Sequence, residues 1–162
     1  MDNQLTVIVA QYALFAVAAA AAVVWLMAPR SDKVSLAFEA VVAMVLVAVM
    51  VKVAGAIHVD PRPFVQNPAV KPLFPHPADN GFPSDHTALA IAISAVVRQY
   101  SRSVDWAMLF VSGLIGVARV AAHVHPTLDI VAAIIIGVLR AAGAIWPWLR
   151  GATARRTGNV HR

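Results

Sequence analysis

Five long apolar segments take up most of this chain, and they limit what it can fold into more than any other feature. They lie at about 5–27, 34–57, 84–100, 103–122 and 126–149. A helix rises about 1.5 Å per residue, so about 20 apolar residues cross the roughly 30 Å hydrocarbon core of a bilayer. Of the 162 residues, 60% are hydrophobic and only 13% are charged. We therefore expect an all-α integral membrane protein, a single membrane-embedded domain over 1–162 that crosses the bilayer five times.

The basic residues set the expected orientation, because short cytoplasmic loops are enriched in Lys and Arg. If the amino terminus is outside, eight of the thirteen fall inside: Arg30, Lys33, Arg98, Arg102, Arg150, Arg155, Arg156 and Arg162. The sequence thus predicts a multi-pass protein of the cytoplasmic membrane with a basic cytoplasmic tail at 150–162. A signal peptide is the alternative for the first segment, but the opening MDNQ has no basic residue. The net charge of +5 is scattered rather than gathered in a patch, so no nucleic-acid partner is expected.

One long connection, 58–82, joins the second and third segments on the expected outer side. It holds six of the ten prolines of the chain. Proline fixes φ and lacks an N–H, so we expect this loop to be extended and stiff rather than helical, lying over the bundle.

The expected topology brings the unusual polar residues to this same membrane face. They are Lys52, Arg62, Ser84, His86, Arg119, His125 and Asp129. Ionisable groups at membrane depth are costly and mark sites or pathways, although any one of them could instead snorkel to the lipid headgroups. The seven together indicate a site.

The side-chain types in this set suit an anionic ligand. Lys52, Arg62 and Arg119 supply positive charge, and arginine binds phosphate oxygens through two parallel hydrogen bonds. Ser84 stands where a helix N-cap belongs, so the free N–H groups of that helix would face the same ligand. In a purely structural interpretation, Ser84 caps the helix and Asp85 stabilises its first turn.

His125 and Asp129, in HVHPTLDI, are the candidate nucleophile and its partner. Pro126 suits the first turn of a helix, which places Asp129 one turn from His125. Such a carboxylate keeps one imidazole nitrogen protonated and leaves the other free to attack phosphorus. Metal binding by His123, His125 and Asp129 is the alternative, but three nearby cations disfavour a divalent ion, so no metal or cofactor is expected.

Three blocks of the sequence resemble, in order, the motifs of the phosphatidic acid phosphatase type two superfamily of lipid phosphate phosphatases. They are KVAGAIHVDPRPF (52–64), FPSDHT (82–87) and ARVAAHVHPTLD (118–129). They match the Lys…Arg-Pro, Pro-Ser-x-His and Arg-x5-His-x3-Asp elements of that family.

The resemblance implies a role for each matched residue. The phosphoryl oxygens would be bound by Lys52, Arg62, Ser84 and Arg119, and we count Asp85 among these phosphate-site residues. His125 would be the nucleophile that forms a phosphohistidine, and Asp129 would orient it. His86 would protonate the leaving oxygen and then activate water.

Two positions depart from the family pattern. Nine residues rather than six separate Lys52 from Arg62, and Asp85 replaces the glycine of Pro-Ser-Gly-His. Asp85 and the PRPF run resemble the bacitracin-resistance branch, the undecaprenyl pyrophosphate phosphatases. The resemblance therefore implies hydrolysis of a polyprenyl diphosphate at the outer membrane face by a four-helix catalytic core. The alternatives are a phosphatase for another phospholipid or a prenyl-phosphosugar, and a non-catalytic lipid-phosphate binder or transporter.

Overall fold

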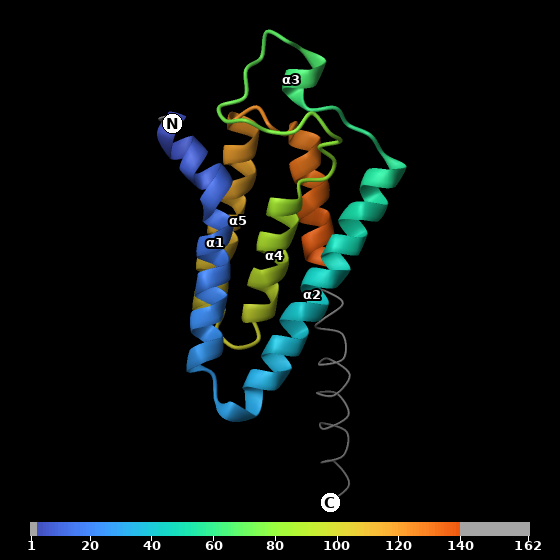
Figure 1. Cartoon of the computed structure of the whole chain (residues 1–162). Coiled ribbons are helices and arrows are strands. Elements are labelled where there is room, and N and C mark those ends of the chain that lie inside the picture. Colours follow the sequence, from blue (N-terminus) through green and yellow to red (C-terminus); the bar gives the residue numbers. More distant parts are fainter. Residues whose placement is uncertain (1–2, 140–162) are drawn as a thin grey trace, which may run out of the picture.

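The structure is a computed structural model that describes residues 3–139. Its helices are α1 (Asn3–Met27), α2 (Arg30–Ile57), α3 (Pro63–Gln66), α4 (Asp85–Val97), α5 (Arg102–Ala121) and a further apolar helix, Thr127–Leu139 (Figure 1). Within this part of the chain the only extended pairing is an isolated β-bridge between Pro61 and Asn80. The all-α prediction is confirmed for the described residues.

Three of the described helices, α1, α2 and α5, are long and apolar enough to cross a membrane. The segment predicted at 84–100 forms the shorter helix α4, whose 13 residues span about 20 Å at about 1.5 Å per residue. It begins inside the protein, because its N-cap residue Ser84 is completely buried. The predicted segment 126–149 begins as a helix at Thr127, and its end and the tail 150–162 lie outside the described residues. The count of five spans stays a prediction.

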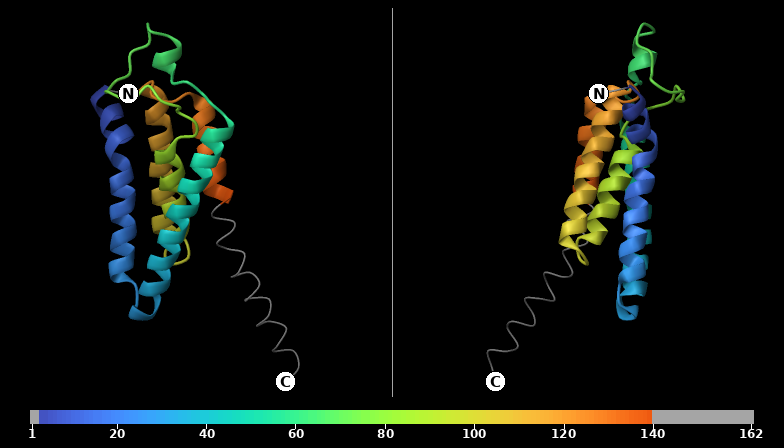
Figure 2. Two further views of the ribbon diagram at one scale, coloured as in Figure 1. Left: turned by 45° about the vertical axis from the view of Figure 1, so that its right-hand side comes forward. Right: turned by 90° about the vertical axis from the view of Figure 1, so that its left-hand side faces the viewer.

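Helix α4 occupies the centre of the bundle, where it packs against α1, α2 and α5 (Figures 1 and 2). Its buried residues are mostly small or β-branched: Thr87, Ala88, Ala90, Ile91, Ala92, Ser94, Val96 and Val97. Small residues let helix backbones approach closely, and this close packing drives helix association inside a bilayer. Large apolar side chains such as Phe15 and Phe38 lie instead on the outer surface, where lipid tails would contact them.

The connection between α2 and α4 lies at the same end of the bundle as the turn between α5 and Thr127–Leu139 (Figure 1). Our expectation that it contains no helix was wrong at Pro63–Gln66, the single turn α3. Pro63 stands at the first helical position, where the missing N–H would have no intrahelical partner in any case.

This connection is fixed to the end of α5 rather than loose. The backbone N–H of Leu73 donates to the carbonyl of Ala122 at 3.1 Å. The buried Phe74 side chain belongs to one apolar cluster with Ala118, Ala122 and Val124. The loop therefore forms a fixed wall over the polar end of the bundle.

Helix α5 approaches Thr127–Leu139 closely at Gly116, where an added Cβ would lie 2.7 Å from Cγ2 of Ile130. We expect Gly116→Ala to destabilise the protein by about 1–3 kcal/mol through overpacking, measured as a lower melting temperature in detergent. Gly113→Ala is the matched control on the same helix, because nothing lies within 4 Å of its added Cβ. Equal melting temperatures for the two variants would contradict this packing.

Candidate active site

His125 and Asp129 form a buried hydrogen-bonded pair beside the turn that joins α5 to Thr127–Leu139. Nδ1 of His125 lies 2.8 Å from Oδ2 of Asp129, and the side chains are 2% and 0% exposed. Because a carboxylate accepts hydrogen bonds, Nδ1 carries the proton and donates. The predicted pairing of these two residues across one helical turn is present.

The other nitrogen of His125 faces two arginines. Its Nε2 atom lies 3.1 Å from an Nη atom of Arg119 and 3.3 Å from an Nη atom of Arg62. A guanidinium has donors only, so Nε2 accepts and carries a lone pair. Burial lowers the pKa of His125, and the positive charges of Arg119 and Arg62 lower it further against the opposing effect of Asp129. The ring is therefore neutral, with its nucleophilic nitrogen pointing between two cations.

Arg62 is almost completely buried and is held by Asp79 in the long loop and by the Val124 carbonyl in the turn after α5. Its Nε atom donates to Oδ1 of Asp79 at 2.9 Å, and a second nitrogen lies 2.9 Å from the same oxygen. A third nitrogen donates to the carbonyl of Val124 at 2.7 Å. The Asp79 side chain is 62% exposed, so the carboxylate that compensates part of the Arg62 charge lies on the solvent side of that guanidinium.

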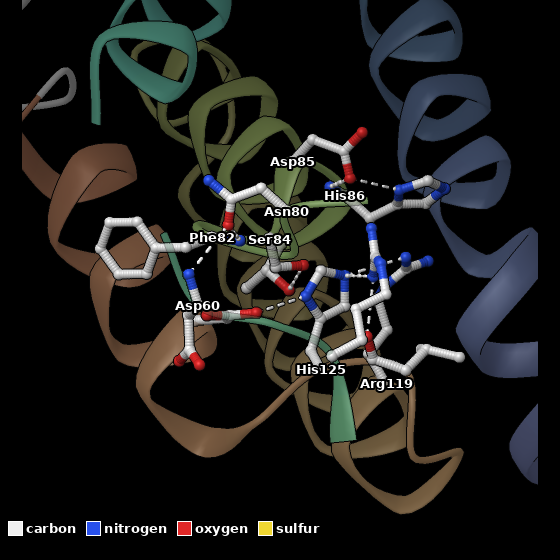
Figure 3. Close-up of polar contacts among 12 residues, drawn as sticks. Asp60, Asn80, Phe82, Ser84, Asp85, His86, Arg119 and His125 are labelled. Atoms are coloured by element: carbon white, nitrogen blue, oxygen red, sulfur yellow. Dashed lines mark hydrogen bonds and ion pairs between the residues drawn. The ribbon is translucent and has the colours of Figure 1, made fainter. Parts of the chain in front are cut away.

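Backbone pairing places Arg62 next to the start of α4. Pro61 and Asn80 form the β-bridge, and the N–H of Gly81 donates to the carbonyl of Asp60 at 3.2 Å. The Asn80 amide oxygen accepts from the backbone N–H groups of Asp60 and Phe82 (Figure 3). Its amide nitrogen donates to the carbonyl of Gly55, at 2.8 Å. Asn80 thus joins the end of α2, at Gly55, to the first and last parts of the loop, at Asp60 and Phe82.

Arg119, in the last turn of α5, is 2% exposed. One Nη atom donates to the carbonyl of Ala10 in α1 at 3.2 Å. The other lies 2.9 Å from Nε2 of His76 and 3.1 Å from Nε2 of His125. Its Nε atom is buried without a hydrogen-bond partner among the described residues, which leaves one donor for a ligand.

His86 and Asp85 form a second imidazole–carboxylate pair at the start of α4. Nδ1 of His86 lies 2.8 Å from Oδ1 of Asp85, which also accepts from the His86 backbone N–H. Figure 3 shows the Asp85 carboxylate turned toward the His86 ring. The Asp85 carboxylate therefore faces His86, and its assignment to the phosphate site stays a prediction.

The predicted residues Ser84 and Lys52 take up different positions. Ser84 is the N-cap residue of α4, but its side chain makes no capping hydrogen bond, and its hydroxyl lies 3.1 Å from that of Thr87. Its backbone N–H donates to the carbonyl of Asp129. Lys52 lies on α2 and is exposed at the cavity. Ser84 thus lies behind the site wall, whereas Lys52 lies at its surface.

A cavity of about 470 Å³ connects these groups. Its lining includes Lys52, Arg62, His76, His86, Arg119 and His125. Gly81 is also part of the wall, and a Cβ there would lie 2.8 Å from Oδ2 of Asp129 and 3.4 Å from Nδ1 of His125. The narrow space beside the His125–Asp129 pair therefore requires a residue without a side chain.

Sequence reasoning missed four residues of this site: His76, Asp79, Asn80 and Gly81. His76 lies in none of the three sequence blocks, although its position between Pro75 and Pro77 marks a rigid segment. Burial lowers the pKa of His76 to about 4, with further lowering by the charges of Arg62 and Arg119. The His76 ring is thus neutral at physiological pH.

The metal alternative has no structural support in residues 3–139, which contain no group of three or more His, Cys, Asp or Glu side chains placed to hold an ion. The exposed His123 ring lies 3.2 Å from the carbonyl of Lys71. The donors that do converge, two buried guanidinium groups and a lysine, suit an anion with several oxygens.

Three comparisons place this arrangement among known proteins. A family model described as the PAP2 superfamily matches residues 36–152. A protein of Bacillus licheniformis named bacitracin transport permease protein BcrC is 31% identical over 162 residues, 100% of this chain and 76% of that protein. The undecaprenyl-diphosphatase BcrC of Bacillus subtilis is 26% identical over 85% of this chain and 70% of its own.

A solved structure shares the fold. The crystal structure of LpxE from Aquifex aeolicus superposes with a TM-score of 0.66 and 26% identity, over 86% of this chain and 80% of that one. The resemblance carried by the three sequence blocks is therefore confirmed over most of the chain, and this protein belongs to the PAP2 superfamily.

Proposed function

We propose that this protein is a membrane phosphatase that removes the terminal phosphate of a lipid diphosphate through a phosphohistidine at His125. The observation that carries this proposal is the state of the His125 ring. Its Nδ1–H is held by the buried Asp129, and the lone pair of Nε2 points between Arg62 and Arg119. A neutral imidazole nitrogen beside two cations is arranged to attack an anionic phosphoryl group.

In the first step, Nε2 of His125 attacks the terminal phosphorus and an N–P bond forms while the P–O bond to the bridging oxygen breaks. Arg62 and Arg119 stabilise the negative charge on the transferred oxygens, as phosphoryl transfer requires. Asp129 stabilises the positive charge that develops on the ring. His86 gives a proton to the leaving oxygen, and the lipid monophosphate departs.

In the second step, His86 takes a proton from water, and the resulting hydroxide attacks the phosphohistidine. The N–P bond breaks, inorganic phosphate is released, and His125 returns to its neutral form. Asp85, whose carboxylate accepts from Nδ1 of His86, supports both proton transfers by holding the ring in one orientation. Lys52, exposed at the cavity, adds positive charge for the substrate despite its longer spacing from Arg62.

The substrate we propose is undecaprenyl diphosphate or a related polyprenyl diphosphate. The likeness to a protein named undecaprenyl-diphosphatase supports this choice, and Asp85 and the PRPF run point to the same branch. A phosphatase for another phospholipid or a prenyl-phosphosugar would use the same catalytic groups. A binder or transporter would need the cations but not the His125–Asp129 pair or His86.

We further propose that the chain forms one domain with five spans, in which four helices bear the site. The cavity then faces the outer side of the cytoplasmic membrane and the carboxyl terminus is cytoplasmic. The basic residues of the short connections at the other end of the bundle support this orientation, since Arg30, Lys33, Arg98 and Arg102 lie there.

His125→Ala tests the nucleophile. With undecaprenyl diphosphate labelled in its terminal phosphate, wild-type protein should form an acid-labile labelled adduct and release phosphate. The variant should form no adduct and lose at least about 10³-fold in rate, because the attacking atom is absent. His123→Asn is the control and should retain activity, since its ring faces the Lys71 carbonyl. Phosphate release by the alanine variant at more than a tenth of the wild-type rate would refute the mechanism.

Gly81→Ala tests the requirement for space beside the catalytic pair. The added methyl group should displace the Asp129 carboxylate from Nδ1 of His125. We expect kcat to fall about 10- to 100-fold, the cost of misplacing a reacting group, while KM changes little. Gly113→Ala should show neither effect, because its site is open. An unchanged kcat in the Gly81 variant would mean that the pair tolerates this displacement.

Single cysteines test the orientation, because the chain contains none of its own. Ala69→Cys, in the connection 58–82, should react with a membrane-impermeant maleimide in intact cells. Ser103→Cys, at the opposite end of the bundle, should react only after the membrane is permeabilised. The reverse labelling pattern would place the cavity on the cytoplasmic side.

A further inference from the structure

His76 lies in the wall of the cavity although none of the three sequence motifs includes it. It is carried by the connection 58–82, 43 positions before Arg119, and its Nε2 atom lies 2.9 Å from an Nη atom of that arginine. The same Nη atom lies 3.1 Å from Nε2 of His125. A single guanidinium nitrogen thus joins the loop histidine to the proposed nucleophile.

Hydrogen-bond direction fixes the part that His76 plays in this contact. The guanidinium of Arg119 only donates, so Nε2 of His76 accepts and its proton resides on Nδ1, which faces the carbonyl of Pro77 at 3.5 Å. Burial lowers the pKa of His76, and the positive charges of Arg62 and Arg119 lower it further, which keeps the ring neutral.

His76 is not equipped for the role of His125. When an imidazole nitrogen attacks phosphorus, the ring becomes positively charged and needs a negative partner. His125 has Asp129 at 2.8 Å, whereas Nδ1 of His76 has only a backbone carbonyl at 3.5 Å. His76 therefore acts on Arg119 rather than on the substrate.

We propose that His76 is a positioning residue of the phosphoryl-transfer site, which accepts a hydrogen bond from Arg119 and so aims that guanidinium at the transferred group. With one hydrogen of the shared Nη held by His76, the other points at Nε2 of His125, where the transferred group would bind, and the unpartnered Nε–H is left to face a phosphoryl oxygen. This role rests on the proposed function.

A neutral histidine at position 76 suits Arg119 because it accepts a hydrogen bond without adding a negative charge. Arg62 is held by the carboxylate of Asp79, which compensates part of its charge. Among residues 3–139, no carboxylate oxygen lies within 4.0 Å of the Arg119 side chain, which pairs instead with His76, His125 and the Ala10 carbonyl. An uncharged acceptor orients Arg119 without adding a contacting negative charge to the more distant one of Asp85, so the positive charge stays available for the phosphoryl group.

The position of His76 is also fixed by contacts of its neighbours in the loop. Two residues earlier, Phe74 is buried in a cluster with Ala118 of α5, one residue before Arg119. The N–H of Leu73 donates to the carbonyl of Ala122. Prolines on both sides of His76 limit its backbone further. The acceptor is thus anchored to the same helix that carries its donor.

Three variants at one position separate hydrogen-bond acceptance from shape and polarity. His76→Leu removes the acceptor, His76→Lys offers only donors, and His76→Gln reaches about as far as Nε2 with a carbonyl oxygen. We expect kcat for the lipid diphosphate to fall about 10- to 100-fold in the leucine and lysine variants, with KM within about threefold. The reason is that a misoriented Arg119 stabilises the transition state less well. The glutamine variant should stay within about fivefold of wild type. His123→Asn, which alters another histidine contact to the same loop, is the control and should match wild type.

Thermal stabilisation of the purified protein by orthovanadate gives a second readout that does not need turnover. Vanadate should raise the melting temperature of wild type and of the glutamine variant, and raise that of the leucine and lysine variants less. Wild-type kcat in the leucine variant, or equal losses in all three His76 variants, would overturn the role of His76 while leaving the phosphatase intact. A wild type that hydrolyses no lipid phosphate, but shows the vanadate difference, would overturn the proposed function and leave the role of His76 standing.

Discussion

Two buried guanidinium groups donate to one imidazole nitrogen, and the rest of the site depends on keeping that arrangement stable. Burying a charge is costly unless it is paired or hydrogen-bonded, and Arg62 and Arg119 are both almost fully enclosed. Each is therefore surrounded by acceptors drawn from distant parts of the chain: a carboxylate and a carbonyl for Arg62, an imidazole and a carbonyl for Arg119. The loop, the turn after α5 and the first helix all supply hydrogen-bond acceptors for these two buried cations. The enclosed positive charge that results is what an anionic substrate would neutralise.

The features that could be predicted from the sequence are those fixed by local geometry. Arg119, His125 and Asp129 lie within eleven consecutive residues at the ends of two helices, so their spacing alone brings them together. The long apolar runs likewise mark α1, α2 and α5 to within a few residues. The segment expected at 84–100 runs past the end of α4 at Val97, because residues 98–100 form a turn in which the backbone N–H groups of Tyr100 and Ser101 donate to the Val97 carbonyl.

The features that could not be predicted depend on how the long loop crosses the bundle. The partner of His76 lies 43 positions away, and no local pattern determines that separation. The need for glycine at position 81 appears only when the Asp129 carboxylate is seen beside it. Ser84 was placed correctly at the start of α4, but its hydroxyl lies against Thr87 rather than in the cavity, because the N-cap residue is buried below the loop. Its role in binding phosphate stays a prediction, as do the roles of the other site residues.

The contact between Arg119 and the Ala10 carbonyl links the first helix to the proposed active site. The family match begins at residue 36, after α1 has ended, so the motifs alone suggest a helix that serves only as a membrane anchor. Yet a main-chain oxygen of α1 accepts from the guanidinium of Arg119, which also contacts the proposed nucleophile, His125. A shortened chain starting at α2 would keep every motif residue and still leave one nitrogen of that cation without its acceptor. The amino-terminal helix is in this sense part of the architecture of the proposed active site.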